Sequence, residues 1–224
     1  MRVALIGNQN SGKTTLFNLL TGHNQKIGNW PGVTIERKEG RIRTTDFELI
    51  DLPGIYSLSP YTIEEEISRK YLFEENVDLI LNILDSTNLE RSLYLTTQLL
   101  ELNIPVVVAL NMTDIAAQRG INIDYKYLEE ILDTTMIPIS ALKKTGIFDL
   151  IQVIKSKNFR KNNYKHIYDH ELEDCLEKIE AEITHDHQRY ISVKLVENDE
   201  AFNSFHQNGS KKIIDNLCLK YNRD

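Results

Sequence analysis

Residues 7–14 form the segment with the clearest chemical meaning. They fit the pattern GxxxxGK(S/T) and lie between an apolar run typical of a strand and a run with helical spacing. In such a segment successive backbone N–H groups can surround phosphate oxygens, and the dipole of the next helix favours negative charge. Lys13 would reach the β- and γ-phosphates of a nucleotide, and the Thr14 hydroxyl would bind Mg²⁺. The predicted phosphate-binding residues are Gly7, Asn8, Gln9, Asn10, Ser11, Gly12, Lys13, Thr14 and Thr15.

A second motif, Asp51-Leu52-Pro53-Gly54, ends the apolar run at 47–51. The pattern DxPG is also common in turns, so its function depends on its position after the phosphate segment and at a strand end. There we expect the Asp51 carboxylate near Mg²⁺ and the Gly54 N–H near the γ-phosphate.

Two more segments follow apolar runs and could bind a base. Asn111-Met112-Thr113-Asp114 places a carboxylate where it can accept from guanine N1–H and N2–H₂. Adenine has an acceptor at N1 and would leave that carboxylate unpaired, so the base is predicted to be guanine. An Asn or Asp helix cap is the alternative for this pattern, and the order of the motifs favours the base. The backbone N–H groups of Ser140-Ala141-Leu142 are expected to meet guanine O6.

Residues 23–34 predict a polar loop that stays mobile until a ligand orders it. Thr34 would then supply a second threonine ligand for Mg²⁺, with Gly32 and Val33 beside the phosphates. The only tryptophan, Trp30, stands between Asn29 and Pro31, so we expect its ring to be at least partly exposed and to have a structural role.

The elements that must position these residues follow from the apolar pattern. Short apolar runs, typical of strands covered on both faces, alternate with segments of helical spacing. The runs lie at 2–6, 47–51, 79–84, 105–110 and 136–139, and the helical segments at 14–21, 63–73, 89–102, 125–132 and 147–154. Residues 35–43 and 47–52 flank a turn too short for a helix, so these strands should pair antiparallel. The pattern predicts a doubly wound, mostly parallel α/β domain.

The domain is expected to span residues 1–160, and a small helical subdomain residues 161–224. Residues 155–165 carry five basic side chains and no acid, whereas residues 171–182 carry six acids and one lysine, which marks a boundary. Glu64-Glu65-Glu66 predicts a solvated helix start that the dipole favours, or else a contact that responds to nucleotide.

Composition excludes some classes of function. The net charge of −7 argues against a chain devoted to binding nucleic acid phosphates. The two cysteines lie far apart, without metal-binding spacing, which suits a reduced cytosolic protein. No run approaches the ~20 apolar residues that cross a bilayer. The pairs His166/His170 and His185/His187 lack a third ligand at suitable spacing, so metal binding there is not favoured.

Together these segments resemble the cytosolic GTPase domain of the FeoB-type ferrous iron transporters. The resemblance covers residues 1–155 and rests on four segments: GNQNSGKTTLFNLLTG at 7–22, GNWPGVTIERKEG at 28–40, DLPGIYSLSPYTIEE at 51–65 and SLYLTTQLLELNIPVVVALNMTD at 92–114. More weakly, RYISVKLVENDE at 189–200 is similar to part of the family's helical subdomain, which is described as restraining GDP release.

The resemblance implies a slow, K⁺-stimulated GTPase that uses Mg²⁺. Asn10 and the carbonyls of Gly28 and Trp30 would bind K⁺, which would stabilise charge as an arginine finger does. Ile55 stands where small GTPases place a glutamine that orients water, so hydrolysis should be slow. Gln9 in place of proline should loosen the phosphate loop, and Met112 in place of lysine should weaken base stacking and speed exchange. The catalytic residues expected are Asn10, Lys13, Thr34 and Gly54.

The resemblance further implies that the chain is the N-terminal piece of a longer membrane protein, at the cytoplasmic face of the bacterial inner membrane. Its partners would be GTP or GDP and its own C-terminal transmembrane domain, with self-association allowed and no nucleic acid. Two alternatives stay open: an RNA-associated GTPase, against which the acidic tail counts, and a P-loop kinase or ATPase, against which residues 111–114 count.

Overall fold

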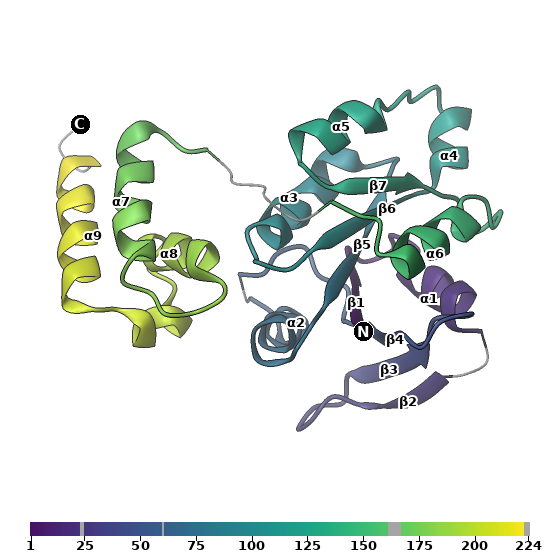
Figure 1. Ribbon diagram of the computed structural model, residues 1–224, viewed down its shortest axis with the longest axis horizontal. Coiled ribbons are helices and arrows are strands. Elements are labelled where there is room, and N and C mark those ends of the chain that lie inside the picture. Colours follow the sequence, from purple (N-terminus) through teal and green to yellow (C-terminus); the bar gives the residue numbers. More distant parts are fainter. Residues whose placement is uncertain (23–24, 60, 161–166, 222–224) are drawn as a thin grey trace. The chain divides into compact units, whose positions relative to one another are not determined.

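The computed structural model describes residues 1–22, 25–59, 61–160 and 167–221 (Figure 1). The chain divides into two compact units. The first comprises residues 1–100 and 104–164, and the second comprises residues 101–103 and 165–224. The basic stretch 155–165, expected to mark the domain boundary, lies partly outside the described residues.

One sheet forms the centre of the first unit. Within the described ranges its strands are β1 (Arg2–Gly7), β2 (Gln25–Asn29), β3 (Glu36–Arg41), β4 (Glu48–Asp51), β5 (Leu79–Asp85), β6 (Val106–Asn111) and β7 (Thr135–Pro138). They lie in the order β2-β3-β4-β1-β5-β6-β7. Strands β4, β1, β5, β6 and β7 run parallel, and β3 pairs antiparallel with both β2 and β4. The predicted mostly parallel sheet and its one antiparallel pair are confirmed.

Strand β2 was not expected, because residues 23–34 predicted a loop. Residues 25–29 instead pair with 36–40 of β3 at the edge of the sheet. The side chains of β2 are mostly exposed, and Ile27 is 64% exposed. Backbone hydrogen bonds to β3, rather than buried side chains, hold this strand. Its sequence therefore has no apolar pattern from which a strand could be predicted.

Helices cover both faces of the sheet (Figure 1). They are α1 (Lys13–Thr21), α2 (Ile63–Glu74), α3 (Leu89–Leu100), α4 (Thr113–Gln118), α5 (Tyr125–Ile131) and α6 (Ile147–Ser156). On one face α1 and α6 bury a core that includes Leu5, Phe17, Leu20, Leu81, Leu150 and Ile154. The other face carries α2 and α3, and the Thr96 hydroxyl of α3 donates to Asn82 Oδ1 of β5 at 2.8 Å.

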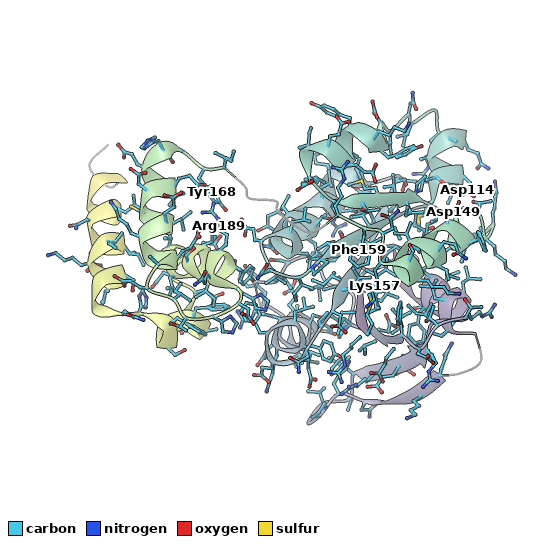
Figure 2. All side chains as sticks on the ribbon, viewed as in Figure 1. Asp114, Asp149, Lys157, Phe159, Tyr168 and Arg189 are labelled. Carbon is cyan, nitrogen blue, oxygen red and sulfur yellow. The ribbon has the colours of Figure 1, made fainter. Side chains whose placement is uncertain are left out.

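The second unit is helical, as predicted. It contains α7 (His170–Glu180), α8 (Gln188–Val196), the 3₁₀ helix η1 (Glu200–Phe205) and α9 (Asn208–Tyr221). Its buried apolar side chains include Leu176, Ile179, Ile183, Tyr190, Ile191, Val193, Leu195, Phe202, Ile214 and Leu217. Arg189 of α8 pairs with Glu173 and Glu180 of α7 at 2.8 and 3.1 Å, so a partly buried arginine joins the two helices (Figure 2 labels Arg189).

In the part of the chain that the structure describes, no helix is both long enough and apolar enough for a bilayer crossing.

Candidate nucleotide site

Residues 8–12 connect β1 to α1 and form the base of the candidate site. Asn10 and Gly12 have φ values of 63° and 92°, and the Ser11 N–H donates to Asn8 O at 3.2 Å. A Cβ at position 12 would collide with Asn111 Nδ2. Gly12 is therefore required both for its left-handed backbone and for the close approach of β6. Helix α1 begins directly after it, so the unpaired N–H groups of its first turn lie at the loop.

A cleft of about 490 Å³ opens above this loop. Its lining residues are Asn8, Gln9, Asn10, Gly12, Lys13, Thr14, Thr15 and Gly54. The structure thus brings most of the predicted phosphate-binding segment to one cleft, together with the glycine of the second motif. Backbone N–H groups at a helix start, with an ammonium group beside them, suit a phosphate chain.

Lys13 and Asp51 meet beside the cleft. Lys13 Nζ lies 2.5 Å from Asp51 Oδ1, and Asp51 is 8% exposed. Burial raises the pKa of the Asp51 carboxyl, and the Lys13 ammonium opposes that rise. The Thr14 hydroxyl and the Asp51 carboxylate are oxygen donors of the kind that Mg²⁺ prefers, so the residues present suit that ion.

The second motif reaches the cleft through Gly54 alone. A Cβ at Gly54 would lie 3.2 Å from Gln9 Cγ, so the two loops touch there. Leu52 and Pro53 are buried. Ile55 is 1% exposed, and its N–H donates to Gly7 O at 3.2 Å. A side chain buried in this way cannot orient a water molecule.

The segment 111–114 lies at the end of β6, one strand from the phosphate loop. Asn111 Nδ2 donates to Ser11 O at 2.8 Å, and its Oδ1 accepts from the Ala141 N–H at 2.9 Å. Asn111 therefore joins the phosphate loop to the segment 140–142. Met112 has a φ of 62° and precedes α4.

Asp114 carries the charge expected of a base-recognition residue (Figure 2 labels it). A side-chain hydrogen bond from Ser140 is the largest of the effects that lower the pKa of its carboxyl, and Lys143 adds to it. Lys143 Nζ lies 3.4 Å from Asp114 Oδ2. The Ser140 N–H donates to Thr145 O at 3.1 Å, and the Leu142 side chain is 78% exposed.

The segment 28–34 does not line this cleft. Gly28 lies in β2, and Gly32 and Thr34 are exposed. The Trp30 carbonyl accepts from the Val33 N–H at 3.2 Å. The structure thus brings Asn10 to the cleft but not the two carbonyls with which it was expected to share K⁺.

The expected exposure of Trp30 is wrong, because its ring is 5% exposed. Tyr71 of α2 meets it edge to face at 5.4 Å between ring centroids, and the Arg37 guanidinium lies 4.7 Å above it. The structural role expected for this ring is consistent with these contacts. Tyr71 lies in α2 and Arg37 in β3, so the residues next to Trp30 in the sequence do not reveal these contacts.

Sequence reasoning missed several residues around the site. Asn111 was expected at the base or as a helix cap, whereas here its amide joins two loops. Lys143, three residues after Ser140, belongs to none of the motifs and pairs with Asp114. Arg91 of α3 lies over the Tyr56 ring at 4.1 Å. Nothing in the local pattern identifies these residues, because each acts across the fold.

The histidines form no metal centre in the described ranges, where no group of three metal-binding side chains occurs. His166 lies outside the described residues. His170 Nδ1 lies 3.4 Å from Asp174, and the His185 and His187 rings are 5.2 Å apart.

A larger hollow, of about 910 Å³, lies where β1 and β4 begin, away from the motifs. Its charged side chains have both signs, and Arg2 there pairs with Glu75 at 2.8 Å. Its lining contains neither the start of α1 nor a residue of the predicted motifs, so the smaller cleft is the candidate site.

Comparison with known proteins agrees with this geometry. Residues 1–154 match the family described as ferrous iron transport protein B. A curated relative is the Fe(2+) transport protein A/Fe(2+) transporter FeoB fusion protein of Porphyromonas gingivalis. It is 44% identical over 92% of this chain and 26% of its own length. The chain thus spans about a quarter of that relative.

Solved structures match over nearly the whole chain. A variant of S. thermophilus NFeoB bound to GDP is 43% identical, with a TM-score of 0.87 over 97% of this chain and 88% of that one. Another variant, bound to GDP and AlF₄⁻, is 42% identical, with a TM-score of 0.83 over the same shares of the two chains. The chain therefore belongs to the ferrous iron transport protein B (FeoB) family, as a Ras-like G domain followed by a helical region.

Proposed function

We propose that this chain binds GTP, hydrolyses it slowly and acts as the switch module that regulates or drives ferrous iron uptake across the bacterial inner membrane. The observation that carries the proposal is the cleft at the start of α1, where Lys13, Thr14 and Gly54 converge. Its relatives bound to GDP and to GDP with AlF₄⁻ support it. The latter combination imitates a phosphoryl group in transfer.

In this proposal the phosphates lie on the N–H groups of the loop and of the first turn of α1. Lys13, released from Asp51, would bind the β- and γ-phosphates, and the Gly54 N–H would face the γ-phosphate. Thr14 and Asp51 would hold Mg²⁺, which neutralises phosphate charge when bound. Because Ile55 is buried, no side chain at that position aligns the attacking water, which supports slow turnover.

Guanine recognition would rest on Asp114. The low pKa of its carboxyl keeps it ionised and able to accept two hydrogen bonds from guanine. Asn111, Met112 and the segment 140–142 would surround the base, and Gly32 and Val33 would approach the phosphates once their loop moves.

Titration with fluorescent GDP and competition by unlabelled nucleotides test this function. We expect GTP and GDP to displace the label and ATP not to. Asp114→Asn should weaken GDP binding by about 100-fold, because an amide cannot accept from both guanine donors, and should favour xanthine nucleotides. Asp46→Asn, at a fully exposed carboxylate, is the control. Displacement by ATP, or full GDP affinity in the Asp114 variant, would contradict the proposal.

K⁺ stimulation is a finer part of the proposal. Asn10 lines the cleft, and the carbonyls of Gly28 and Trp30 would join it when their loop moves. We expect phosphate release to be faster in KCl than in NaCl, and Asn10→Ala to remove most of that difference while it keeps GDP affinity. Equal rates in the two salts would exclude a K⁺ site.

Thr34 is proposed to complete the Mg²⁺ ligands only in the GTP-bound loop. Thr34→Ala should slow hydrolysis and leave GDP binding unchanged, because Thr34 is exposed and outside the cleft in this structure. An unchanged turnover number would remove this role.

We further propose that residues 1–160 are the GTP-binding part and that residues 161–224 restrain GDP release and lead to a membrane part. The partners would be GTP or GDP, that transmembrane domain and, through self-association, further copies of the chain. The location would be the cytoplasmic face of the inner membrane, with no role for nucleic acid. The share of the curated relative that this chain spans supports a longer protein.

A further inference from the structure

Helix α3 contacts the loop after Gly54 at two places. Near its start, the Arg91 guanidinium lies 4.1 Å from the centre of the Tyr56 ring. Two turns later, Gln98 Oε1 accepts from the Leu58 N–H at 2.8 Å and from the Ser57 hydroxyl at 3.2 Å. The loop 54–58 is therefore held against α3 at its middle and at its C-terminal end.

These two contacts differ in kind. Leu58 is fully buried, and a buried backbone N–H must keep a partner, so the Gln98 contact belongs to the folded core. Arg91 is exposed, and among the described residues no carboxylate pairs with its guanidinium. The Arg91 guanidinium lies over the ring of Tyr56, and a contact of this exposed type can break without unfolding the loop.

The same residue also touches the phosphate loop. Asn8 Nδ2 donates to the Arg91 carbonyl at 3.4 Å, and Asn8 is 5% exposed. The start of α3 thus contacts the phosphate loop through its backbone and the Gly54 loop through its side chain. Residue 91 therefore has one contact with each of the two loops.

Position 55 offers no side chain that could align water, because Ile55 is 1% exposed. The Gly54 N–H is the group of this loop that is expected at the γ-phosphate, and its position depends on what holds the loop. We propose that Arg91 is a positioning residue for GTP hydrolysis, which sets the Gly54 backbone through its contact with the Tyr56 ring. The inference rests on the proposed GTPase function and adds a residue that its motifs do not contain.

The test compares turnover number and GDP affinity in single and double variants of the full chain. Arg91→Ala should lower kcat two- to fivefold, the range equivalent to an exposed cation–π contact, and leave GDP affinity within twofold. Tyr56→Ala should match it, and Tyr56→Phe, which keeps the ring, should match the wild type. The double variant Arg91→Ala/Tyr56→Ala should be no slower than either single variant, because both remove one contact.

Arg119→Ala, at an exposed arginine after α4, is the matched control and should change neither quantity. A wild-type kcat in Arg91→Ala overturns the inference. So does a loss of GDP affinity or of thermal stability that accompanies the loss of kcat. A double variant in which the two losses of kcat add also overturns it. A wild-type chain that binds no guanine nucleotide overturns the proposed function itself. If the wild type hydrolyses GTP and Arg91→Ala and Tyr56→Ala have the same kcat as the wild type, only the role of Arg91 is overturned.

Discussion

Three buried polar atoms lie around the Trp30 ring without a hydrogen-bond partner among the described residues. They are Trp30 Nε1, Arg37 Nε and Tyr71 Oη. The Arg37 guanidinium lies 4.7 Å from the centre of the Trp30 ring and 5.9 Å from that of Tyr71, and Arg37 pairs with Glu39. Ring packing and cation–π attraction, rather than hydrogen bonding, must stabilise this group.

Two substitutions separate these contributions. Trp30→Ala should lower the free energy of unfolding by about 3 kcal/mol, because it empties a buried site. Tyr71→Phe should change it by less than about 0.5 kcal/mol, because the lost hydroxyl makes no hydrogen bond. Burial raises the pKa of Tyr71 to about 12, so at neutral pH the variant also loses no charge. Urea denaturation followed by circular dichroism measures both, and a large loss in Tyr71→Phe would reveal a partner for the hydroxyl.

At this scale the sequence predicted residues whose role depends on their immediate neighbours. The phosphate loop was recognised because its glycines, Lys13 and Thr14 act within eight consecutive positions. Trp30 was misjudged because Tyr71 is 41 positions away, and the bridging role of Asn111 was missed because Ser11 is 100 positions away. Such partners become visible only once the chain is folded.

The start of α2 shows how one element is fixed. The Thr62 hydroxyl accepts from the Glu65 N–H at 3.2 Å, and Glu65 Oε2 accepts from the Thr62 N–H at 3.2 Å. Glu65 is 7% exposed, so of three consecutive glutamates the middle one is not solvated. It closes a capping box, which satisfies N–H groups that the helix itself cannot pair.

Removing this cap should destabilise the element by a predictable amount. Thr62→Ala should lower the free energy of unfolding by about 1 kcal/mol, since it leaves an N–H at the helix start without its partner. Glu66→Ala changes an exposed residue of the same turn and should have little effect. Chemical denaturation of the two variants side by side provides the measurement. Equal stabilities would show that water replaces the cap at no cost.

Elements with an apolar pattern were predicted well. The five buried runs became strands, and the five helical segments became helices, because burial dictates where apolar residues must stand. Strand β2 and the six-residue α4 were not expected. Both depend on backbone partners, β2 on β3 and α4 on the turn at Met112, rather than on an apolar face.

At the scale of the whole molecule, residues 101–103 belong to the helical unit although they follow α3 in the chain. Tyr168 Oη donates to Glu101 Oε1 at 3.3 Å, and the Asn103 N–H donates to His187 Nδ1 at 3.3 Å. Burial raises the pKa of Glu101 to about 7, against the opposing effects of Arg189, Tyr168 and Lys194, and Glu197 raises it further. Figure 2 labels Tyr168 and Arg189 in this unit.

This pKa predicts how stability depends on pH. The folded chain keeps the Glu101 proton up to about pH 7, whereas the ordinary pKa of a glutamate carboxyl, as in the unfolded chain, is 4.5. The folded state binds more protons in between, so this carboxyl lowers the free energy of unfolding as pH rises through that window. Between pH 5 and pH 8 this effect should lower the free energy of unfolding of the wild type by on the order of 1 to 3 kcal/mol. Glu101→Gln should remove that decrease.

Urea denaturation at four pH values across that window measures the slope. The exposed Glu200→Gln is the control and should keep the slope of the wild type. If Glu101→Gln and the wild type have parallel profiles, Glu101 ionises in the folded chain as it does in the unfolded one.

The bridging amide of Asn111 has a consequence for synthesis. The phosphate loop is synthesised well before the residues whose contacts hold it, Asn111 and, through it, Ala141. Strand β1, which precedes the loop, likewise cannot pair with β5 until residues 79–85 have been synthesised. On the ribosome the phosphate loop therefore lacks these contacts until Ala141 has been synthesised. Until β5 has been synthesised, one edge of β1 lacks its partner strand, and unpaired strand edges favour aggregation.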